Sequence, residues 1–238
     1  MSTENLLYKS EIEINDKIKI IIPTVGQIID DEESYYGVVS LVTAMPIDVM
    51  VALDDAGIDF TQINEWQLFL LMFQSLSAQD TSLVFGDLDL TKFQLAESQD
   101  NHSVVLLDPE NDIIIDRSIH YQMADALRKV HHLERDTRKP GNDEARKYLI
   151  ERARIKQRRK KHKKEESQLE SLIVALVNTE QYKYDFEGTR ELSIYQFNES
   201  VRQCIKKIDY DNRMRGVYAG TIDAKELSQD DLTWLTHK

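Results

Sequence analysis

The start of the chain alternates between apolar and polar residues. Five isoleucines share one parity, with Asn15-Asp16 as a turn between them: Ile12, Ile14, Ile18, Ile20 and Ile22. A period of two is typical of a β-strand with one buried face. The pattern therefore predicts a small β-hairpin over residues 12–22.

After Pro23 the apolar residues recur at helical spacing. Residues 38–42 predict a helix that ends near Pro46, and Pro46 suits the first turn of another helix that runs to Gly57. Asn64 and Gln67 have the spacing of a capping box, which predicts that a helix begins there. One apolar face of that helix is then formed by Trp66, Phe69, Leu70 and Phe73.

Strand patterns return in the middle of the chain. Residues 82–95, 104–107 and 113–115 favour strands, with a turn at Pro109 between the last two. A helix is predicted from about Ser118, with an apolar stripe of Tyr121, Ala124, Leu127 and Val130, and it ends at the Arg138-Lys139-Pro140-Gly141 sequence. We place a domain boundary there, between an acidic mixed α+β domain (1–139) and a helical domain (140–238).

Residues 142–179 contain no glycine or proline and are rich in residues that favour helix, so we predict one long helix. Its apolar residues lie at the two ends, around Leu149–Ala153 and Leu169–Val177. Residues 157–168 include no apolar residue and span about 18 Å at 1.5 Å per residue. We expect this stretch to cross solvent or to lie on an acidic partner.

The last predicted helix begins at Ser193, where Gln196 completes a second capping-box pattern. Gly216, which follows Arg213 and Arg215, is the predicted end of this helix. We expect it to pair in antiparallel fashion with the long helix before it. The predicted fold class is α+β and predominantly α: small β-hairpins in the N-terminal domain, then a long charged helix and an antiparallel helical C-terminal part.

Charge changes this picture more than composition does. The formal net charge is −12 over 238 residues. Residues 1–126 carry 5 basic and 23 acidic side chains, residues 127–164 carry 16 and 5, and residues 165–238 carry 9 and 14. Such a division steers the encounter with partners but does not specify a fold.

Candidate chemistry is sparse. Asp108, Glu110 and Asp112 alternate like the start of a calcium loop, but Ile113 and Ile119 stand where that loop needs a glycine and a bidentate acid. We interpret the three acids as an acidic hairpin turn. His131 and His132 are adjacent and so point in different directions from a helix, which favours a structural or surface role over a metal site.

The remaining signals for catalysis are weak. Cys204 is the only cysteine, and it lies on the apolar face of its helix, where a reactive thiolate is disfavoured. The G-x-x-x-x-G-K-S/T, G-x-G-x-x-G and G-x-S-x-G motifs do not occur. We therefore expect a protein that is not an enzyme, with no catalytic, cofactor or metal site. No secretory signal and no apolar run long enough for a membrane span is present, so we expect an intracellular protein without a membrane partner.

One run of basic residues, between residues 152 and 164, has a more specific functional interpretation. It can neutralise phosphates of a nucleic acid, but no aromatic residue between Tyr148 and Tyr182 is present to stack on bases. Plain solvation, contact with the chain's own acidic domain and contact with a neighbouring subunit are the alternatives, and we favour protein contact or solvation over nucleic acid. The candidate charged surface consists of Arg152, Arg154, Lys156, Arg158, Arg159, Lys160, Lys161, Lys163 and Lys164.

Several stretches resemble proteins of tailed-phage morphogenesis regions. In the second half these are residues 166–188, 193–223 and 226–235; AMPIDVMVALDDAGIDF, INEWQLFLLMF and TSLVFGDLDLTKF have a similar character in the first half. The pattern is similar to tail assembly chaperones or minor tail components of phages that infect Gram-positive hosts. None of these stretches is a catalytic motif.

The resemblance implies a tail assembly chaperone-like factor that binds tape-measure or tail-tube subunits in the host cytoplasm, without chemistry of its own. Acidic and basic blocks on one chain also make a homo-oligomer an expectation. One alternative is a minor structural protein of the tail or neck that stays in the virion. The other is a nucleic-acid-binding protein that uses the basic helix.

Overall fold

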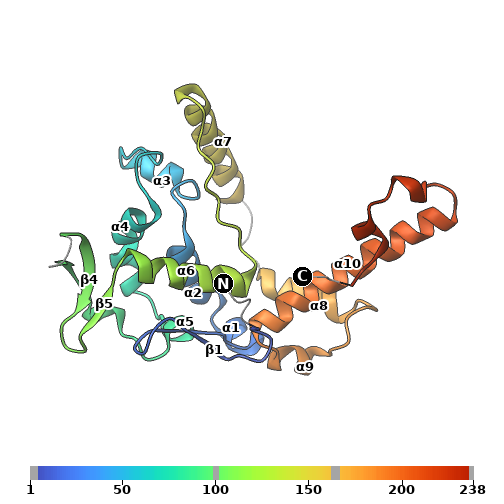
Figure 1. Ribbon diagram of the computed structural model, residues 1–238, viewed down its shortest axis with the longest axis horizontal. Helices are drawn as coiled ribbons and strands as arrows, with labels where there is room; N and C mark the ends of the chain where they lie inside the picture. Colours follow the sequence, from blue (N-terminus) through green and yellow to red (C-terminus); the bar gives the residue numbers. More distant parts are fainter. Residues whose placement is uncertain (1–4, 99–101, 162–166, 236–238) are drawn as a thin grey trace.

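The computed structural model describes residues 5–98, 102–161 and 167–235, the side chains of residues 160 and 161 excepted (Figure 1). It begins with the predicted hairpin, in which β1 (Glu11–Glu13) and β2 (Lys19–Ile21) pair antiparallel, with Ile12 opposite Ile20. The Asn15 side chain closes the turn, since its Oδ1 accepts hydrogen bonds from the backbone N–H groups of residues 17 and 18. The hairpin prediction is confirmed.

Four helices follow: α1 (Val25–Asp30), α2 (Glu32–Thr43), α3 (Met50–Asp55) and α4 (Glu65–Ser77). The capping box of Asn64 and Gln67 is present at the start of α4, as predicted. α3 begins later than predicted, at Met50 instead of Pro46. Asp48 Oδ2 accepts a hydrogen bond from the Met45 N–H at 2.9 Å, and this turn takes the place of the first helical turn.

The strand prediction for residues 82–95 is wrong over most of its length. These residues form α5 (Ser82–Phe85) and the short 3₁₀ helix η1 (Leu90–Lys92), and only their end belongs to β3 (Gln94–Glu97). The carboxylates of Asp80 and Asp89 accept hydrogen bonds from the backbone N–H groups of residues 82 and 91. These local bonds offer the backbone an alternative to a sheet ladder.

The predicted strands on either side of Pro109 are present. β3, β4 (Val104–Asp108) and β5 (Ile113–Ile115) form an antiparallel sheet in that order, at one end of the molecule (Figure 1). α6 (Arg117–His131) then crosses the middle of the body, and its buried face contains Met123, Leu127 and Val130. Tyr121, predicted on that face, is instead exposed.

The single long helix predicted for residues 142–179 is wrong. α7 spans Asp143–Lys161, and a separate helix α8 spans Gln168–Val177. Ser167 has non-helical backbone angles, and its side chain accepts a hydrogen bond from Glu170 N, so it starts a new helix. The Glu32 carboxylate fixes this start, because it accepts hydrogen bonds from the Ser167 hydroxyl and from the Leu169 N–H.

The C-terminal part consists of α9 (Phe186–Glu191), α10 (Ile194–Tyr218) and the short 3₁₀ helices η2 (Ala224–Glu226) and η3 (Gln229–Leu232). The capping box of Ser193 and Gln196 is present. Gly216 does not end α10, which continues to Tyr218. A Cβ at residue 216 would lie 2.6 Å from Ile222 Cδ1, so this glycine makes room for the chain that folds back. Figure 1 shows the outer part of α10 and the tail projecting from the body.

The main hydrophobic core unites both halves of the chain. Leu169, Ile194 and Phe197 are buried in the same cluster as residues of the hairpin, α1, α2, α4 and α6. The predominantly α, α+β fold class is confirmed. The domain boundary after residue 139 stays a prediction. Among the described residues, no helix combines the length and apolar character needed to cross a membrane.

Candidate interaction surface

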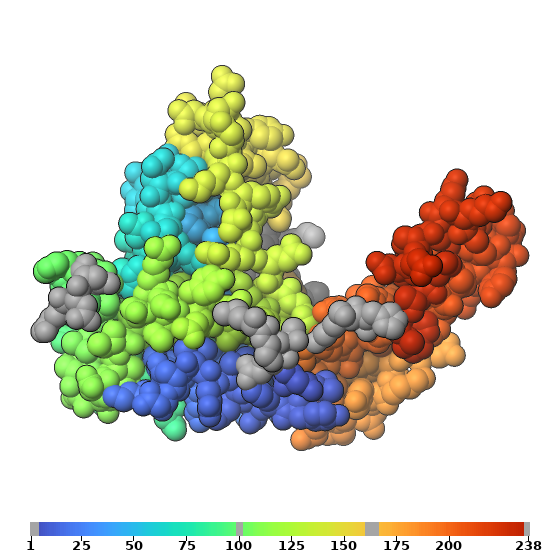
Figure 2. All heavy atoms as spheres, in the orientation of Figure 1, coloured from blue at the N-terminus to red at the C-terminus, as the bar shows by residue number. Residues whose placement is uncertain are grey.

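α7 contacts the body along one side, next to α3 (Figures 1 and 2). Ile150 is the one buried side chain among the described residues of α7, with 7% of its surface exposed. It belongs to a second, smaller apolar cluster with Ala44, Leu53, Phe60 and Leu68. The hydrophobic contact that holds α7 is therefore narrow.

Ion pairs flank Ile150 on both sides. Arg146 Nη1 lies 2.6 Å from Asp59 Oδ2, and Arg154 Nη2 lies 2.6 Å from Asp54 Oδ2 and 2.5 Å from Asp55 Oδ1. The pKa of Asp59 is lowered by hydrogen bonds from the backbone and hydroxyl of Thr61, and Arg146 lowers it further. The bonds to Asp55 and Asp54 raise the pKa of Arg154. Part of the basic run thus meets acids of the chain's own α3.

The residues of the predicted charged surface differ in their contacts. Among those whose side chains the structure describes, Arg154 alone forms an ion pair. Arg152 is exposed, with its guanidinium carbon 5.7 Å from the centre of the Tyr148 ring, and Arg158 and Arg159 are exposed near the C-terminal end of the helix. The residues for which no side-chain position is described are Lys160 and Lys161, at the end of α7, and Lys163 and Lys164, which lie outside the described residues.

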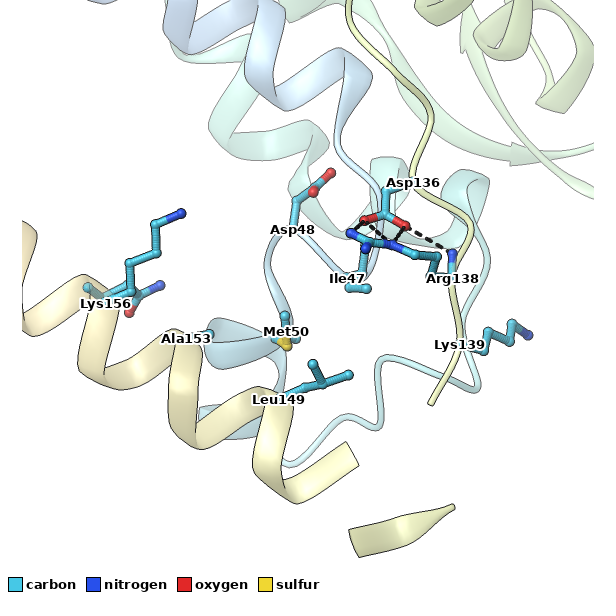
Figure 3. A pocket seen from close by; sticks show the side chains of 10 residues that line it. Ile47, Asp48, Met50, Asp136, Arg138, Lys139, Leu149, Ala153 and Lys156 are labelled. Atoms are coloured by element: carbon cyan, nitrogen blue, oxygen red, sulfur yellow. Dashed lines mark hydrogen bonds and ion pairs between the residues drawn. The ribbon is translucent and has the colours of Figure 1, made fainter. Parts of the chain in front are cut away.

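Lys156 lines a hollow of about 550 Å³ between α7, the loop before α3 and the segment before α7 (Figure 3). We call it the α7 groove. Its apolar walls come from both sides of the α3–α7 contact, and its rim is polar. The lining residues are Ile47, Asp48, Met50, Asp136, Arg138, Lys139, Leu149, Ala153, Lys156 and Gln157.

The polar rim of the α7 groove is partly neutralised. Arg138 donates three hydrogen bonds to the Asp136 carboxylate, at 2.5 to 3.1 Å, and these bonds lower the pKa of Asp136 to about 2. Lys139 Nζ contacts only the Thr61 carbonyl, at 3.5 Å, within the described part of the chain. Lys156 has no ion pair or hydrogen bond to another described residue.

The sequence did not identify Arg146 or its partners. Asp59 is 87 residues away from Arg146, and Asp54 is 100 residues away from Arg154. Nothing in the local pattern links them. Residues 20–91 contain acidic residues but no lysine or arginine. This stretch is the one sequence signal that such partners exist, and it does not say which acids they are.

A second polar cluster lies between α4 and α6. Arg128 Nη2 donates to Glu65 Oε1 at 2.5 Å and to the Thr43 carbonyl at 2.6 Å, and Arg135 Nε donates to Glu65 Oε2 at 3.0 Å. Nearby, burial lowers the pKa of His120 to about 4, and its ring stacks on Phe69 with 4.1 Å between ring centres. The Glu65 carboxylate has a cationic partner on each oxygen, which is a structural arrangement.

The other candidate site residues from the sequence also make contacts that stabilise the fold. Asp108 is buried and caps the β4–β5 turn, where its Oδ1 accepts from Glu110 N at 3.0 Å, so the hairpin-turn interpretation is confirmed. His131 Nε2 lies 2.8 Å from Tyr35 Oη, and burial lowers the pKa of this histidine to about 4. Burial raises the pKa of the Cys204 thiol. Within the described residues, no group of three or more His, Cys, Asp or Glu is placed to hold a metal ion.

Comparison with known proteins gives one finding. Residues 160–238 match a family model described as the YomV second domain. The match starts at the end of α7 and covers about a third of the chain. Neither the curated proteins nor the solved structures contain a match. YomV comes from a Bacillus phage or prophage, so the last third of this chain is similar to a phage-associated domain.

Proposed function

We propose that this chain is a phage morphogenesis factor, similar in role to a tail assembly chaperone, that acts by binding other tail proteins. The observation that carries the proposal is the way α7 is held. One side of this helix contacts α3 and the loop after it through Ile150 and the ion pairs of Arg146 and Arg154, while its other sides face solvent. A helix attached in this way presents charged side chains on a rigid support.

The solvent face of α7 mixes apolar and cationic residues. Tyr148 and Ile155 are 62% and 42% exposed. Arg152 and Arg159, each four residues further along the chain, are also exposed. Their spacing of four, three and four residues places all four on one face of a helix. Exposed aromatic and arginine side chains are enriched in protein interfaces, and their charge sets partner choice and encounter rate.

The projecting C-terminal arm offers a second surface. From Ile205 to Leu235 no described side chain is buried, although this segment contains several large apolar residues. Tyr218 is 87% exposed at the end of α10, and Ile205 and Leu235 are about half exposed. Exposed apolar surface of this kind supports a role in holding a partner protein. The arm lies in the part of the chain that matches the phage-associated domain.

Co-purification tests the proposal. The chain is co-expressed with the tape-measure and tail-tube proteins of its phage, and we expect at least one of them to be retained at low salt. Retention falls when Arg152 and Arg159 are both replaced by glutamine. The matched control replaces Lys129 and Lys183, two exposed lysines away from α7, by glutamine. The proposal is wrong if the wild-type chain retains neither tail protein.

The same surfaces suit a permanent role as a minor structural protein of the tail or neck. The exposed arm favours this alternative, because an attached protein keeps its apolar surface covered in the particle. Mass spectrometry of purified virions separates the two roles: an assembly factor is depleted from finished particles, and a structural protein is present in fixed proportion to the tail-tube subunit.

The exposed residues Arg158 and Arg159 near the C-terminal end of α7 favour nucleic acid as another alternative. A helix that neutralises several phosphates loses affinity steeply as salt rises. We expect the quadruple replacement of Arg158, Arg159, Lys160 and Lys161 by glutamine to abolish retention of duplex DNA at low salt, if DNA is the partner. This alternative fails if the wild type shifts neither DNA nor RNA at low salt.

A further inference from the structure

We infer that the α7 groove is a docking site for an acidic amphipathic segment of a partner protein. This inference rests on the proposed binding function and names the chemistry of the partner. It concerns the hollow that α7 leaves open beside α3, not the solvent face of α7.

The groove has an apolar floor built from two separate elements. Leu149 and Ala153 line it from α7, while Ile47 and Met50 line it from the segment that leads into α3 (Figure 3). None of these four side chains is fully buried. A hollow of about 550 Å³ lies within the range of about 300 to 1,000 Å³ that is usual for ligand sites. It has room for large apolar side chains that would contact both α7 and the body.

The charges on the rim select the occupant. Arg138 is neutralised by Asp136, whereas Asp48 accepts a hydrogen bond from the Met45 N–H and has no cationic partner among the described residues, so it offsets one of the lysines on the rim. Lys156 and Lys139 then remain without a carboxylate partner among the described residues, on opposite sides of the hollow (Figure 3). An apolar floor between two such lysines is complementary to a segment that carries apolar side chains on one face and carboxylates beside them.

The surroundings disfavour a nucleic acid in the same place. Asp54 and Asp55 lie at the end of α3, about one helical turn after the groove residue Met50, and each is bound to Arg154. A nucleic acid in the groove would bring its phosphates near these carboxylates. It would also cover the apolar floor with a polar backbone that makes no favourable contact there. A peptide with separated acidic residues avoids both costs.

Peptide binding tests the inference on the full-length chain. The probe is a fluorescently labelled synthetic helix with leucine on one face and glutamate on both flanks, and the control peptide has lysine in place of each glutamate. Fluorescence anisotropy gives the dissociation constants. We expect the acidic peptide to bind with an affinity that falls as salt rises, and the basic peptide not to bind.

Two changes in the groove separate shape from charge. Ala153→Trp fills the hollow without changing charge, and we expect at least a tenfold loss of affinity. Lys156→Gln removes a rim charge, and we expect about a fivefold loss, since an exposed charge contributes little. The matched control is Lys147→Gln, which removes the same charge from an exposed position of the same helix outside the groove. Leu149→Gln, which makes the floor polar, repeats the shape test if Ala153→Trp displaces α7.

The inference is wrong if the acidic peptide does not bind, or if Ala153→Trp and Leu149→Gln both bind it as the wild type does. It is also wrong if Lys147→Gln weakens binding as much as Lys156→Gln. These outcomes are distinct from failure of the proposed function. If the wild type and Ala153→Trp retain tail proteins equally, the proposed function is supported and the groove is rejected. If the chain binds the peptide but retains no tail protein, the groove is supported and the proposed function is rejected.

Discussion

Replacement of Ile150 by alanine should release α7 from the body without unfolding the protein. Ile150 is the single buried side chain among the described residues of α7, and it packs in the small cluster with Leu53 and Phe60. The ion pairs of Arg146 and Arg154 join partly exposed side chains, so they add little to its attachment. The docked state of α7 therefore depends mainly on this isoleucine.

The size of the effect follows from the atoms removed. Ile150→Ala deletes three carbon groups, each worth about 0.8 kcal/mol when buried, and the side chain is 7% exposed, so the loss is about 2 kcal/mol. A further cost for an internal cavity is small, because the neighbouring α7 groove is open and α7 can adjust. A loss of about 2 kcal/mol raises the population of the undocked helix about 30-fold.

Native-state hydrogen exchange measures this change locally. We expect exchange of the amides in residues 146–156 to become about 30-fold faster, while amides of α4 and α6 keep their protection. The matched control is Ile155→Ala, which removes the same atoms from an exposed position of the same helix. Unchanged protection of α7 in Ile150→Ala would refute the reasoning, and so would an equal loss of protection across the whole molecule.

Three further predictions concern stability. Arg128→Met leaves one Glu65 oxygen without its buried cation and should lower the free energy of unfolding by about 3 to 5 kcal/mol. Arg135→Gln, at a half-exposed position, should lower it by less than about 1 kcal/mol. Equal effects of the two variants in urea denaturation would contradict this prediction. Gly216→Ala should speed tryptic cleavage of the tail, because the new Cβ would lie 2.6 Å from Ile222 Cδ1, and an unchanged cleavage rate would count against that contact. Burial lowers the pKa of His131 from 6.5 to about 4, so the unfolded chain binds this proton first and stability should fall as pH drops from 6.5 towards 4. In His131→Gln the unfolding midpoint should depend less on pH over that range, and equal slopes would refute the assignment.

Local side-chain chemistry explains which elements could be predicted from the sequence. The turn at Asn15 and the capping boxes at Asn64 and Ser193 form between residues three or fewer positions apart, so their spacing alone indicates them. The error at residues 82–95 has the same origin. There the carboxylates of Asp80 and Asp89 bind nearby backbone N–H groups, a competing local signal that the apolar alternation concealed.

The candidate surface was predictable only in part. The composition of residues 152–164 predicts a solvated basic helix, and the exposed positions of Arg152, Arg158 and Arg159 agree with that. Which residues of the helix meet the body depends on contacts across the fold. Arg154 and Lys156 look equivalent in the sequence, yet one is bound to two aspartates and the other faces the groove. The break at Ser167 depends likewise on Glu32, which lies 135 residues away.

The contact between the N-terminal segment and the start of α10 has a consequence for how this chain can be divided. The Ile194 N–H donates to the Pro23 carbonyl at 2.9 Å, the Val25 N–H donates to the Leu192 carbonyl at 2.8 Å, and the Ile194 and Phe197 side chains are fully buried. A fragment cut at the start of the YomV-like match would expose those side chains to water and leave both ends of this backbone pairing open. The stretch that carries the family likeness thus relies on a segment near the start of the chain to complete its structure.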